Sequence, residues 1–257
     1  MVYTALWGIA IVLLAASLAA AGAALVQRLV PVQLRKSHNV AIGIIYGGLY
    51  ILFGVMVGFT AFLVLDKYNA AQETVQNEAG DVEELYEIAE RFPEPKRSQI
   101  QESVAVYART VIDDEWPLMG EGLESPSVEA LGDALRANLQ EIEPKTSAQQ
   151  ALYSRGLETI GDLEESRDVR LLYASEGLPP MLWIAIAVLS LNMMFFSFVI
   201  GMESGRLHVA MVSALAAGIV IVLFTIGTLD RPFGTDARVG PEPFELVLRE
   251  IGESNGR

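Results

Sequence analysis

The stretch that decides the fold is VAIGIIYGGLYILFGVMVGFTAFLVL, residues Val40–Leu65, which contains no charged side chain. About 20 consecutive apolar residues are enough to cross the ~30 Å hydrocarbon core of a bilayer as a helix. Three further segments meet this requirement, namely Tyr3–Val26, Met181–Met202 and Leu207–Leu229. The sequence therefore predicts an all-α membrane protein with four transmembrane helices.

The four apolar segments form two pairs, and a polar block separates the pairs. This block, Asp66–Pro180, carries 25 Asp and Glu residues and 10 Lys and Arg residues, a net charge of −15. We therefore expect two transmembrane hairpins with a soluble domain inserted between them. The expected parts are a first hairpin at 1–65 (spans 3–26 and 40–65), an acidic soluble helical domain at 66–180, a second hairpin at 181–229 (spans 181–202 and 207–229) and a C-terminal tail at 230–257.

Apolar residues recur every three or four positions through most of the polar block, which is typical of amphipathic helices. The recurring residues are Tyr68, Ala71, Val75, Val82, Leu85 and Ile88, then Ile100, Val104, Tyr107 and Val111, then Val128, Leu131, Leu135, Leu139 and Ile142. No helix breaker lies between Leu65 and Phe92-Pro93, so we expect the second transmembrane helix to continue into the soluble domain. Ser125 or Ser127 is the expected cap of a later helix, and a last helix is expected at Thr146–Glu176. These helices are sufficient for a bundle.

The turns of both hairpins are rich in basic residues. Arg28, Arg35 and Lys36 lie in or beside the first turn, and Arg206 lies in the second. Cytoplasmic loops of membrane proteins carry an excess of Lys and Arg, so this pattern favours cytoplasmic turns. The soluble domain and both termini would then lie on the extracytoplasmic side.

Asn192, near the middle of the third span, is the amide side chain inside the spans. An amide in hydrocarbon is costly unless it is hydrogen-bonded, so we expect Asn192 to face protein or water rather than lipid. Two roles are open: a hydrogen bond to a neighbouring helix, and a place in the lining of a pore. We expect it to face the second span or a symmetry axis.

Glycines in the second span form two GxxxG pairs, Gly43 with Gly47 and Gly54 with Gly58. Such pairs allow the backbones of two helices to approach closely. The glycines are therefore candidates for helix packing, and a bare backbone stripe along a conduction path is the alternative. The cores of the spans contain no ionisable side chain for a proton relay, which argues against a proton-coupled transporter.

Signatures of enzymes are largely missing. The chain has no Cys and two His residues, and it contains neither HExxH nor GxSxG. The pattern closest to a metal site is Asp113-Asp114-Glu115, and consecutive residues on a helix point to different faces. We therefore expect no enzymatic activity, no cofactor, no catalytic or metal-binding residues and no nucleic-acid partner.

Several strings in the chain are shared with a known family. They are His38-Asn39, Gly43, Tyr50, Gly58, Tyr68, Ala71, Glu78-Ala79, Tyr107, Glu115-Trp116-Pro117, Trp183 and Asp230-Arg231-Pro232-Phe233-Gly234. Over roughly residues 28–250 the chain resembles the bacterial membrane family catalogued as domain of unknown function 4239, which is also labelled bestrophin-like. The resemblance implies a multi-pass protein of the bacterial cytoplasmic membrane. Because bestrophins are pentameric anion channels, it also implies a homo-oligomer in the lipid bilayer that conducts a small ion.

Three residues in these strings are candidates for structural or ion-binding roles. Trp116 lies before Pro117 at an expected helix end and either packs in the bundle or lies at the membrane interface. Arg231 follows the fourth span, where it could clamp the chain by bonding the last carbonyls of that helix or by pairing with an acid such as Glu115 or Asp66, or could coordinate an anion at a pore mouth. Two functions remain open: an oligomeric bestrophin-like ion channel, and a non-conducting sensor or scaffold whose acidic domain binds a partner or ligand.

Overall fold

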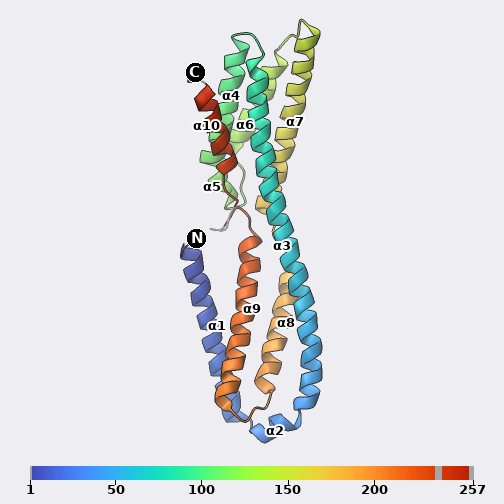
Figure 1. The fold of residues 1–257 in the computed structure, drawn as a ribbon, viewed down its shortest axis with the longest axis vertical. Helices are drawn as coiled ribbons and strands as arrows, with labels where there is room; N and C mark the ends of the chain where they lie inside the picture. Colours follow the sequence, from blue (N-terminus) through green and yellow to red (C-terminus); the bar gives the residue numbers. More distant parts are fainter. Residues whose placement is uncertain (1, 235–238, 255–257) are drawn as a thin grey trace. The chain divides into compact units, whose positions relative to one another are not determined.

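The computed structural model describes residues 2–234 and 239–254, and within these ranges the chain forms helices and no strands (Figure 1). Four helical stretches are long and apolar enough to cross a membrane. The protein is therefore an all-α membrane protein, as the sequence predicts. It divides into two compact units: a membrane unit, made of the residues up to Asp66 with Leu178–Asp230, and a soluble unit, made of Lys67–Gly177 with the described tail residues after Asp230.

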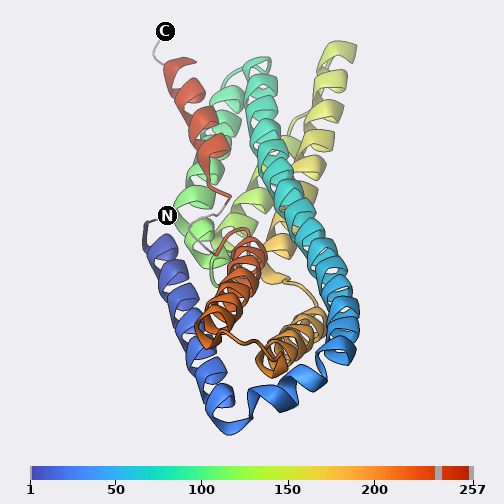
Figure 2. The ribbon, with the colours of Figure 1, turned by 60° about the horizontal axis from the view of Figure 1, so that its bottom comes forward.

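The membrane unit contains four long helices and one short one. They are α1 (Val2–Leu29), α2 (Val32–Ser37), the first part of α3 (Asn39–Glu90), α8 (Pro180–Val199) and α9 (Gly205–Leu229). These bounds lie within a few residues of the expected spans at all ends but one, since α3 continues well past Leu65. The short helix α2 occupies the turn of the first hairpin. In Figures 1 and 2, α9 lies between α1 and α8, and α8 lies between α9 and α3.

Small residues bring α1 and α9 together. Ala19 and Ala23 of α1 are buried against Val212 and Ala216 of α9. A Cβ atom on Gly8 would lie 2.8 Å from the ring of Phe224 in α9. In hydrocarbon, where the hydrophobic effect does not drive association, such close approach supplies the packing energy between helices.

A second cluster joins α3, α8 and α9 around Phe53, Ile186, Met193 and Ile219. Only one side of α3 takes part in it. The intramolecular packing of the membrane unit therefore relies on the small residues of α1, and on large side chains of α3 rather than on its glycines.

The soluble unit is an all-helical bundle. It comprises the second part of α3, α4 (Lys96–Thr110), a π-helical turn (Val111–Glu115), α5 (Trp116–Met119), α6 (Pro126–Gln140), α7 (Ser147–Ser175) and α10 (Glu242–Ser254). The expected continuation of the second span is confirmed, because α3 extends to Glu90 as one helix. Of the two candidate caps for α6, Ser125 is the one used, and its Oγ accepts a hydrogen bond from the N–H of Val128.

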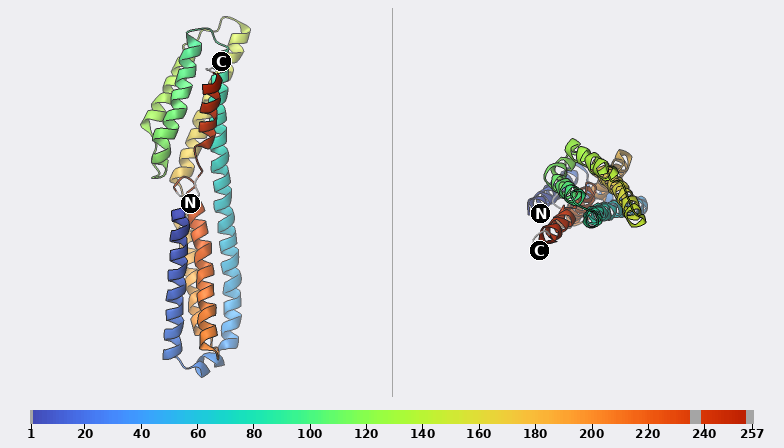
Figure 3. Two further views of the ribbon diagram at one scale, coloured as in Figure 1. Left: turned by 60° about the vertical axis from the view of Figure 1, so that its left-hand side comes forward. Right: turned by 90° about the horizontal axis from the view of Figure 1, so that it is seen from above.

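The bundle buries the apolar faces that the spacing predicts. Fully buried residues include Val75, Val82, Leu85, Ile100 and Val104, and each such side chain contributes roughly 1.5–3 kcal/mol when removed from water. Two features differ from expectation. Helical backbone continues through the π turn and past Trp116 to the end of α5. The tail contains α10 (Figure 3), and Phe244, Val247 and Ile251 of this helix pack into the same core.

Candidate functional site

Two glutamate and two arginine side chains meet inside the soluble unit. Arg170 of α7 is fully buried, with Nε 2.5 Å from Oε2 of Glu78 on α3 and Nη2 2.7 Å from Oε2 of Glu115. Arg167, one turn earlier on α7, donates from Nη2 to Oε1 of Glu115 at 2.6 Å. Both carboxylates are themselves fully buried. This set of Glu78, Glu115, Arg167 and Arg170, termed the buried ionic cluster below, has no net charge.

Aromatic side chains surround the buried ionic cluster. The hydroxyl of Tyr107 donates to Oε1 of Glu78 at 3.0 Å. The guanidinium of Arg170 lies 5.3 Å from the ring centre of Trp116, within range of a cation–π interaction. Trp116 also makes edge-to-face contacts with Phe233 and Phe244, both with ring centroids at 5.9 Å. Of its two expected positions, Trp116 therefore occupies the one packed in the bundle.

The π-helical turn directs Glu115 inward. π turns inside helices are rare and occur often at functional positions. Here Asp113 and Asp114 are exposed, Asp114 accepts a hydrogen bond from the hydroxyl of Ser125, and Glu115 alone points into the core. The N–H of Ser125 adds a further bond to Oε1 of Glu115 at 3.2 Å. The three consecutive acids therefore diverge, and the residues that the structure describes contain no cluster of three or more His, Cys, Asp or Glu suited to a metal ion.

Burial and charge act in opposite directions on the cluster. Burial alone would raise the pKa of Glu115, but hydrogen bonds and charge from Arg167 and Arg170 outweigh it and hold that pKa below its usual value. Burial, followed by the charge of Glu78, raises the pKa of Tyr107 well above its usual range. Glu115 is therefore ionised and Tyr107 neutral at physiological pH. With its charges balanced and its carboxylates multiply bonded, the cluster is suited to holding α3, the π turn and α7 together rather than to binding a ligand.

Sequence reasoning found part of this cluster. It selected Glu115 and Trp116, and it quoted Glu78 and Tyr107 only as shared strings without a role. It did not identify Arg167 or Arg170 as their partners. One feature of the sequence does indicate a buried charge here: Arg170 is a basic residue on the same face of α7 as the buried Ile160 and Leu163.

Arg231 does not join the cluster. Glu115 is bonded by Arg167 and Arg170, so the expected alternative of a Glu115–Arg231 pair is wrong. Arg231 is exposed and lines a cavity of about 110 Å³ together with Glu121, Glu176 and neighbouring backbone. An anion at this position would meet two carboxylates as well as one guanidinium.

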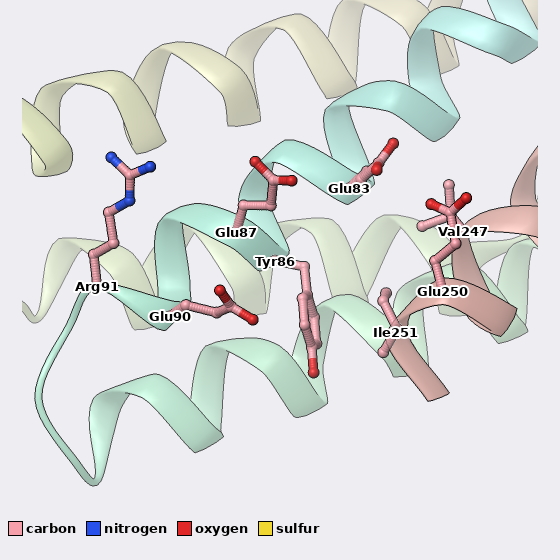
Figure 4. A pocket seen from close by; sticks show the side chains of 8 residues that line it. All are labelled: Glu83, Tyr86, Glu87, Glu90, Arg91, Val247, Glu250 and Ile251. Carbon is pink, nitrogen blue, oxygen red and sulfur yellow. The ribbon is translucent and has the colours of Figure 1, made fainter. Parts of the chain in front are cut away.

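An acidic cavity of about 320 Å³ lies between α3 and α10 (Figure 4). Its lining includes Glu83, Glu87 and Glu90 of α3 and Glu250 of α10, with Arg91 at one end. Burial, followed by the nearby carboxylate of Glu250, raises the pKa of Glu83. This cavity is one place where the acidic surplus of the sequence is concentrated.

The glycine stripe of α3 is open. Gly43, Gly47, Gly54 and Gly58 are exposed, and a Cβ built on any of them would find no atom within 4 Å. Their spacing of four, seven and four residues places them on one face of the helix. They do not mediate packing within the described part of the chain, so that expected role must be sought outside a single subunit.

Asn192 is also exposed on the surface of α8. Its Nδ2 donates to the carbonyl of Val188, one turn earlier in the same helix, at 2.8 Å. Within the chain as described, this amide makes no hydrogen bond to the second span. Of its two expected orientations, the one toward α3 is therefore not found. The other, toward a symmetry axis, exists only in an oligomer and remains a prediction.

The two basic turns are joined to each other at the end of α8. Arg35 is buried, and its Nη1 donates to the carbonyl of Ile200 at 3.2 Å. The amide of Asn39 makes two bonds with the backbone of Gly201, donating to its oxygen at 2.8 Å and accepting from its N–H at 2.9 Å. The last carbonyls of a helix need partners and favour positive charge. Arg35 and Asn39 meet this need for α8.

His208 links the same turns to α1. Its Nε2 lies 2.9 Å from the carbonyl oxygen of Ser197, which can only accept, so this nitrogen carries the hydrogen. Its Nδ1 then accepts from Nε2 of Gln27 at 3.0 Å, and the same Gln27 nitrogen donates to the carbonyl of Gly205 at 3.0 Å. Both ring nitrogens of His208 therefore have hydrogen-bond partners.

Comparison with solved structures recovers this arrangement of helices in distant relatives. A bacterial bestrophin homologue from Klebsiella pneumoniae is similar with a TM-score of 0.70 at 12% identity, over 95% of this chain and 98% of that chain. A variant of the Klebsiella pneumoniae homologue gives a TM-score of 0.68 at 10% identity, over 96% and 99%. At these identities the likeness concerns the fold. No curated protein matches the chain.

A family model described as the bestrophin-like domain matches residues 13–244, which is most of the chain. That range includes the second part of α1, the other three apolar helices, the buried ionic cluster and the start of α10. The chain therefore belongs to the bestrophin-like family.

Proposed function

We propose that this chain assembles with copies of itself into a membrane channel for a small ion, with the glycine stripe of α3 facing the conduction path. The observation that carries the proposal is that this stripe is open in the single chain. Exposed glycines on a membrane helix allow a neighbouring helix to approach closely, and they leave room beside a polar space. A ring of subunits around an axis provides both.

Asn192 of α8 supports the same assembly. Its exposed amide lies in a span whose other exposed residues, such as Leu191 and Phe195, are apolar. A polar side chain at this depth is costly in lipid and is retained where it contacts protein or water. We propose that it reaches an interface or the pore once the subunits assemble. The resemblance to bestrophins favours an anion as the conducted species.

The second candidate function, a non-conducting sensor or scaffold, is favoured by a different observation. The acidic cavity of the soluble unit could receive a basic partner, since clefts lined by one sign of charge concentrate the opposite charge. This function would not require an oligomer. The two candidates therefore differ in whether the purified chain forms a ring and passes ions.

Flux from liposomes distinguishes the two functions. The purified full-length chain should elute as an oligomer in light scattering and should release a loaded ion after reconstitution. Gly47→Leu and Gly54→Leu should reduce this flux, whereas Gly218→Leu, at a glycine of α9 with equally open surroundings, should not. Asn192→Leu should preserve assembly and alter conductance or selectivity. A monomer without flux would favour the sensor or scaffold.

We further propose that both turns are cytoplasmic and the soluble unit extracytoplasmic. The basic residues of the turns support this orientation. A Cys at Ser37 should be protected from an impermeant thiol reagent in intact cells, and a Cys at Ser98 should be labelled. The reverse pattern would overturn this orientation and would leave the channel proposal intact.

A further inference from the structure

The turn end of the membrane unit, defined as residues 27–39 and 200–208, is strongly basic. It contains Arg28, Arg35, Lys36 and Arg206 against one acid, Glu203, a net charge of +3 with neutral His. Lys36 and Glu203 neutralise each other, since Nζ lies 2.6 Å from Oε1. Arg35 is buried and lies against the C-terminal end of α8. Contacts within the chain therefore explain the positions of Lys36 and Arg35, two of the four basic residues.

The other two basic residues, Arg28 and Arg206, have no such contact in the part of the chain that the structure describes. Both side chains are exposed, and neither makes an ion pair with any residue that the structure describes. Arg28 lies in the last turn of α1, where a cation is mildly favoured by the helix dipole. Arg206 lies in the first turn of α9, where a cation is disfavoured by the same effect. The helix dipole thus favours a cation at Arg28 and disfavours one at Arg206.

The two arginines are held close together by their neighbours. Gln27, which precedes Arg28, donates to the carbonyl of Gly205, which precedes Arg206, at 3.0 Å. Adjacent Cα atoms are about 3.8 Å apart, so each arginine starts one residue away from a fixed contact between α1 and α9. Their long side chains can therefore reach a common ligand.

Exposed apolar side chains lie directly beside the arginines. Leu25 and Leu29 are exposed on α1, and Leu207 and Met211 are exposed on α9. These residues belong to helices that are long and apolar enough to cross a membrane. The positive charges thus lie where the apolar surface of the α1–α9 pair ends, which is the level of the phosphate groups of a bilayer.

We propose that Arg28 and Arg206 bind the headgroup phosphate of an anionic phospholipid, whose acyl chains lie against Leu25, Leu29 and Leu207. Guanidinium groups bind phosphate oxygens through two parallel hydrogen bonds, and the dipole of α9 favours an anion at its N-terminus, where Arg206 lies. A free phosphate would use the arginines alone, whereas a phospholipid also covers the apolar side chains. This site does not depend on whether the protein conducts ions.

Native mass spectrometry of the full-length protein tests the proposal. The probes are phosphatidylglycerol and phosphatidylcholine with identical acyl chains, added to delipidated protein. Wild type should retain phosphatidylglycerol in preference to phosphatidylcholine. Each basic residue near an anionic membrane surface is worth about a fivefold change in affinity, so Arg28→Gln/Arg206→Gln should weaken phosphatidylglycerol binding about 25-fold. The matched control is Arg97→Gln/Arg109→Gln, which removes the same charge from exposed positions of the soluble unit.

Three further measurements fix the interpretation. Arg28→Lys/Arg206→Lys keeps the charge and should retain most of the binding, and a thermal melt establishes that each variant is folded. Inorganic phosphate alone should neither displace phosphatidylglycerol nor stabilise the protein comparably. Equal retention of the two lipids by wild type, equal losses in the Arg28/Arg206 and control variants, or stabilisation by inorganic phosphate equal to that by phosphatidylglycerol would each overturn the lipid site.

Discussion

Arg170 and Glu115 are both fully buried, and Nη2 of the arginine lies 2.7 Å from Oε2 of the glutamate. Neither charge could remain in the core alone, since an unpaired buried ion costs several kcal/mol. Their pairing is completed by Glu78 and Arg167, so that four charged side chains from three segments neutralise one another. The soluble unit is thus organised around an electrically neutral centre, although its surface is strongly acidic.

Removing one carboxylate from this centre should destabilise the soluble unit strongly. Glu115→Ala leaves Arg167 and Arg170 with Glu78 as their remaining carboxylate, and we expect a loss of about 3–5 kcal/mol. The measurement is amide hydrogen exchange of α7, which reports stability locally. Glu141→Ala, which breaks an exposed pair with Lys96, should leave the exchange of α7 nearly unchanged. Equal protection in both variants would show that the cluster does not hold the bundle.

Asp81 should make stability depend on pH. Burial, followed by the charge of Asp162, raises its pKa from 3.8 to about 6. Between these values the folded chain retains a proton that the unfolded chain has lost, so stability falls as pH rises through this window, and the penalty is complete above about pH 6. Asp81→Asn removes the penalty and should stabilise the protein by ~1 kcal/mol at pH 7.5, a value reduced for solvent screening of this half-exposed group.

The readout for Asp81 is the melting temperature at two pH values. Asp81→Asn should melt higher than wild type at pH 7.5, and the gain should shrink toward zero as pH falls to 4. Glu73→Gln, at an exposed position of the same helix, serves as the control and should show no such change. A gain from Asp81→Asn that is the same at both pH values would contradict the proposed proton uptake.

Gly201 should not tolerate a side chain. A Cβ at this position would lie 2.5 Å from the backbone nitrogen of Lys36 and 2.8 Å from the carbonyl carbon of Arg35. Because these are backbone atoms, the two turns must move apart, and we expect Gly201→Ala to cost about 1–3 kcal/mol. Gly218→Ala meets nothing within 4 Å and should be neutral or slightly stabilising. Melting temperatures of the two purified variants provide the comparison, and similar values would refute the close contact.

A proline within α3 should be poorly tolerated at Ala70. The helix is continuous from Asn39 to Glu90, so Ala70→Pro removes a backbone hydrogen bond and introduces a clash with the preceding turn. The expected cost is about 3 kcal/mol or more. Ala70→Gly, at about 1 kcal/mol, controls for loss of the side chain. An unchanged melting temperature for Ala70→Pro would mean that the chain near Ala70 is a linker rather than a helix.

The sequence is sufficient for those features that depend on short stretches of chain. Apolar length alone predicts the four spans, and the absence of a breaker predicts the continuous α3. Local residue types narrowed the cap of α6 to Ser125 or Ser127, and the structure shows that Ser125 is used. The helix α10 lies in the expected tail and has an amphipathic pattern of the same kind, which is a sufficient signal for a helix there.

The pairings across the fold could not be obtained in this way. Glu78 and Arg170 lie 92 residues apart, and their contact depends on which faces of α3 and α7 meet. The π turn that directs Glu115 inward has no established sequence signature. The glycines of α3 show a different limit: their GxxxG spacing predicts a close neighbour or a conduction path without saying where it lies, and within the single chain their face is open.

An i→i+5 turn encloses one residue more than an α turn, so the π turn Val111–Glu115 shifts the phase of the chain by one position. A homologue that lacked one residue here would continue as a plain α-helix. Because the wider turn absorbs the extra residue, the side chains that follow, beginning with the counterpart of Trp116, would keep their direction toward the core. A one-residue alignment gap between Thr110 and Pro117 would therefore mark homologues in which a plain α-helix replaces the π turn, while the residues after it keep their places in the core.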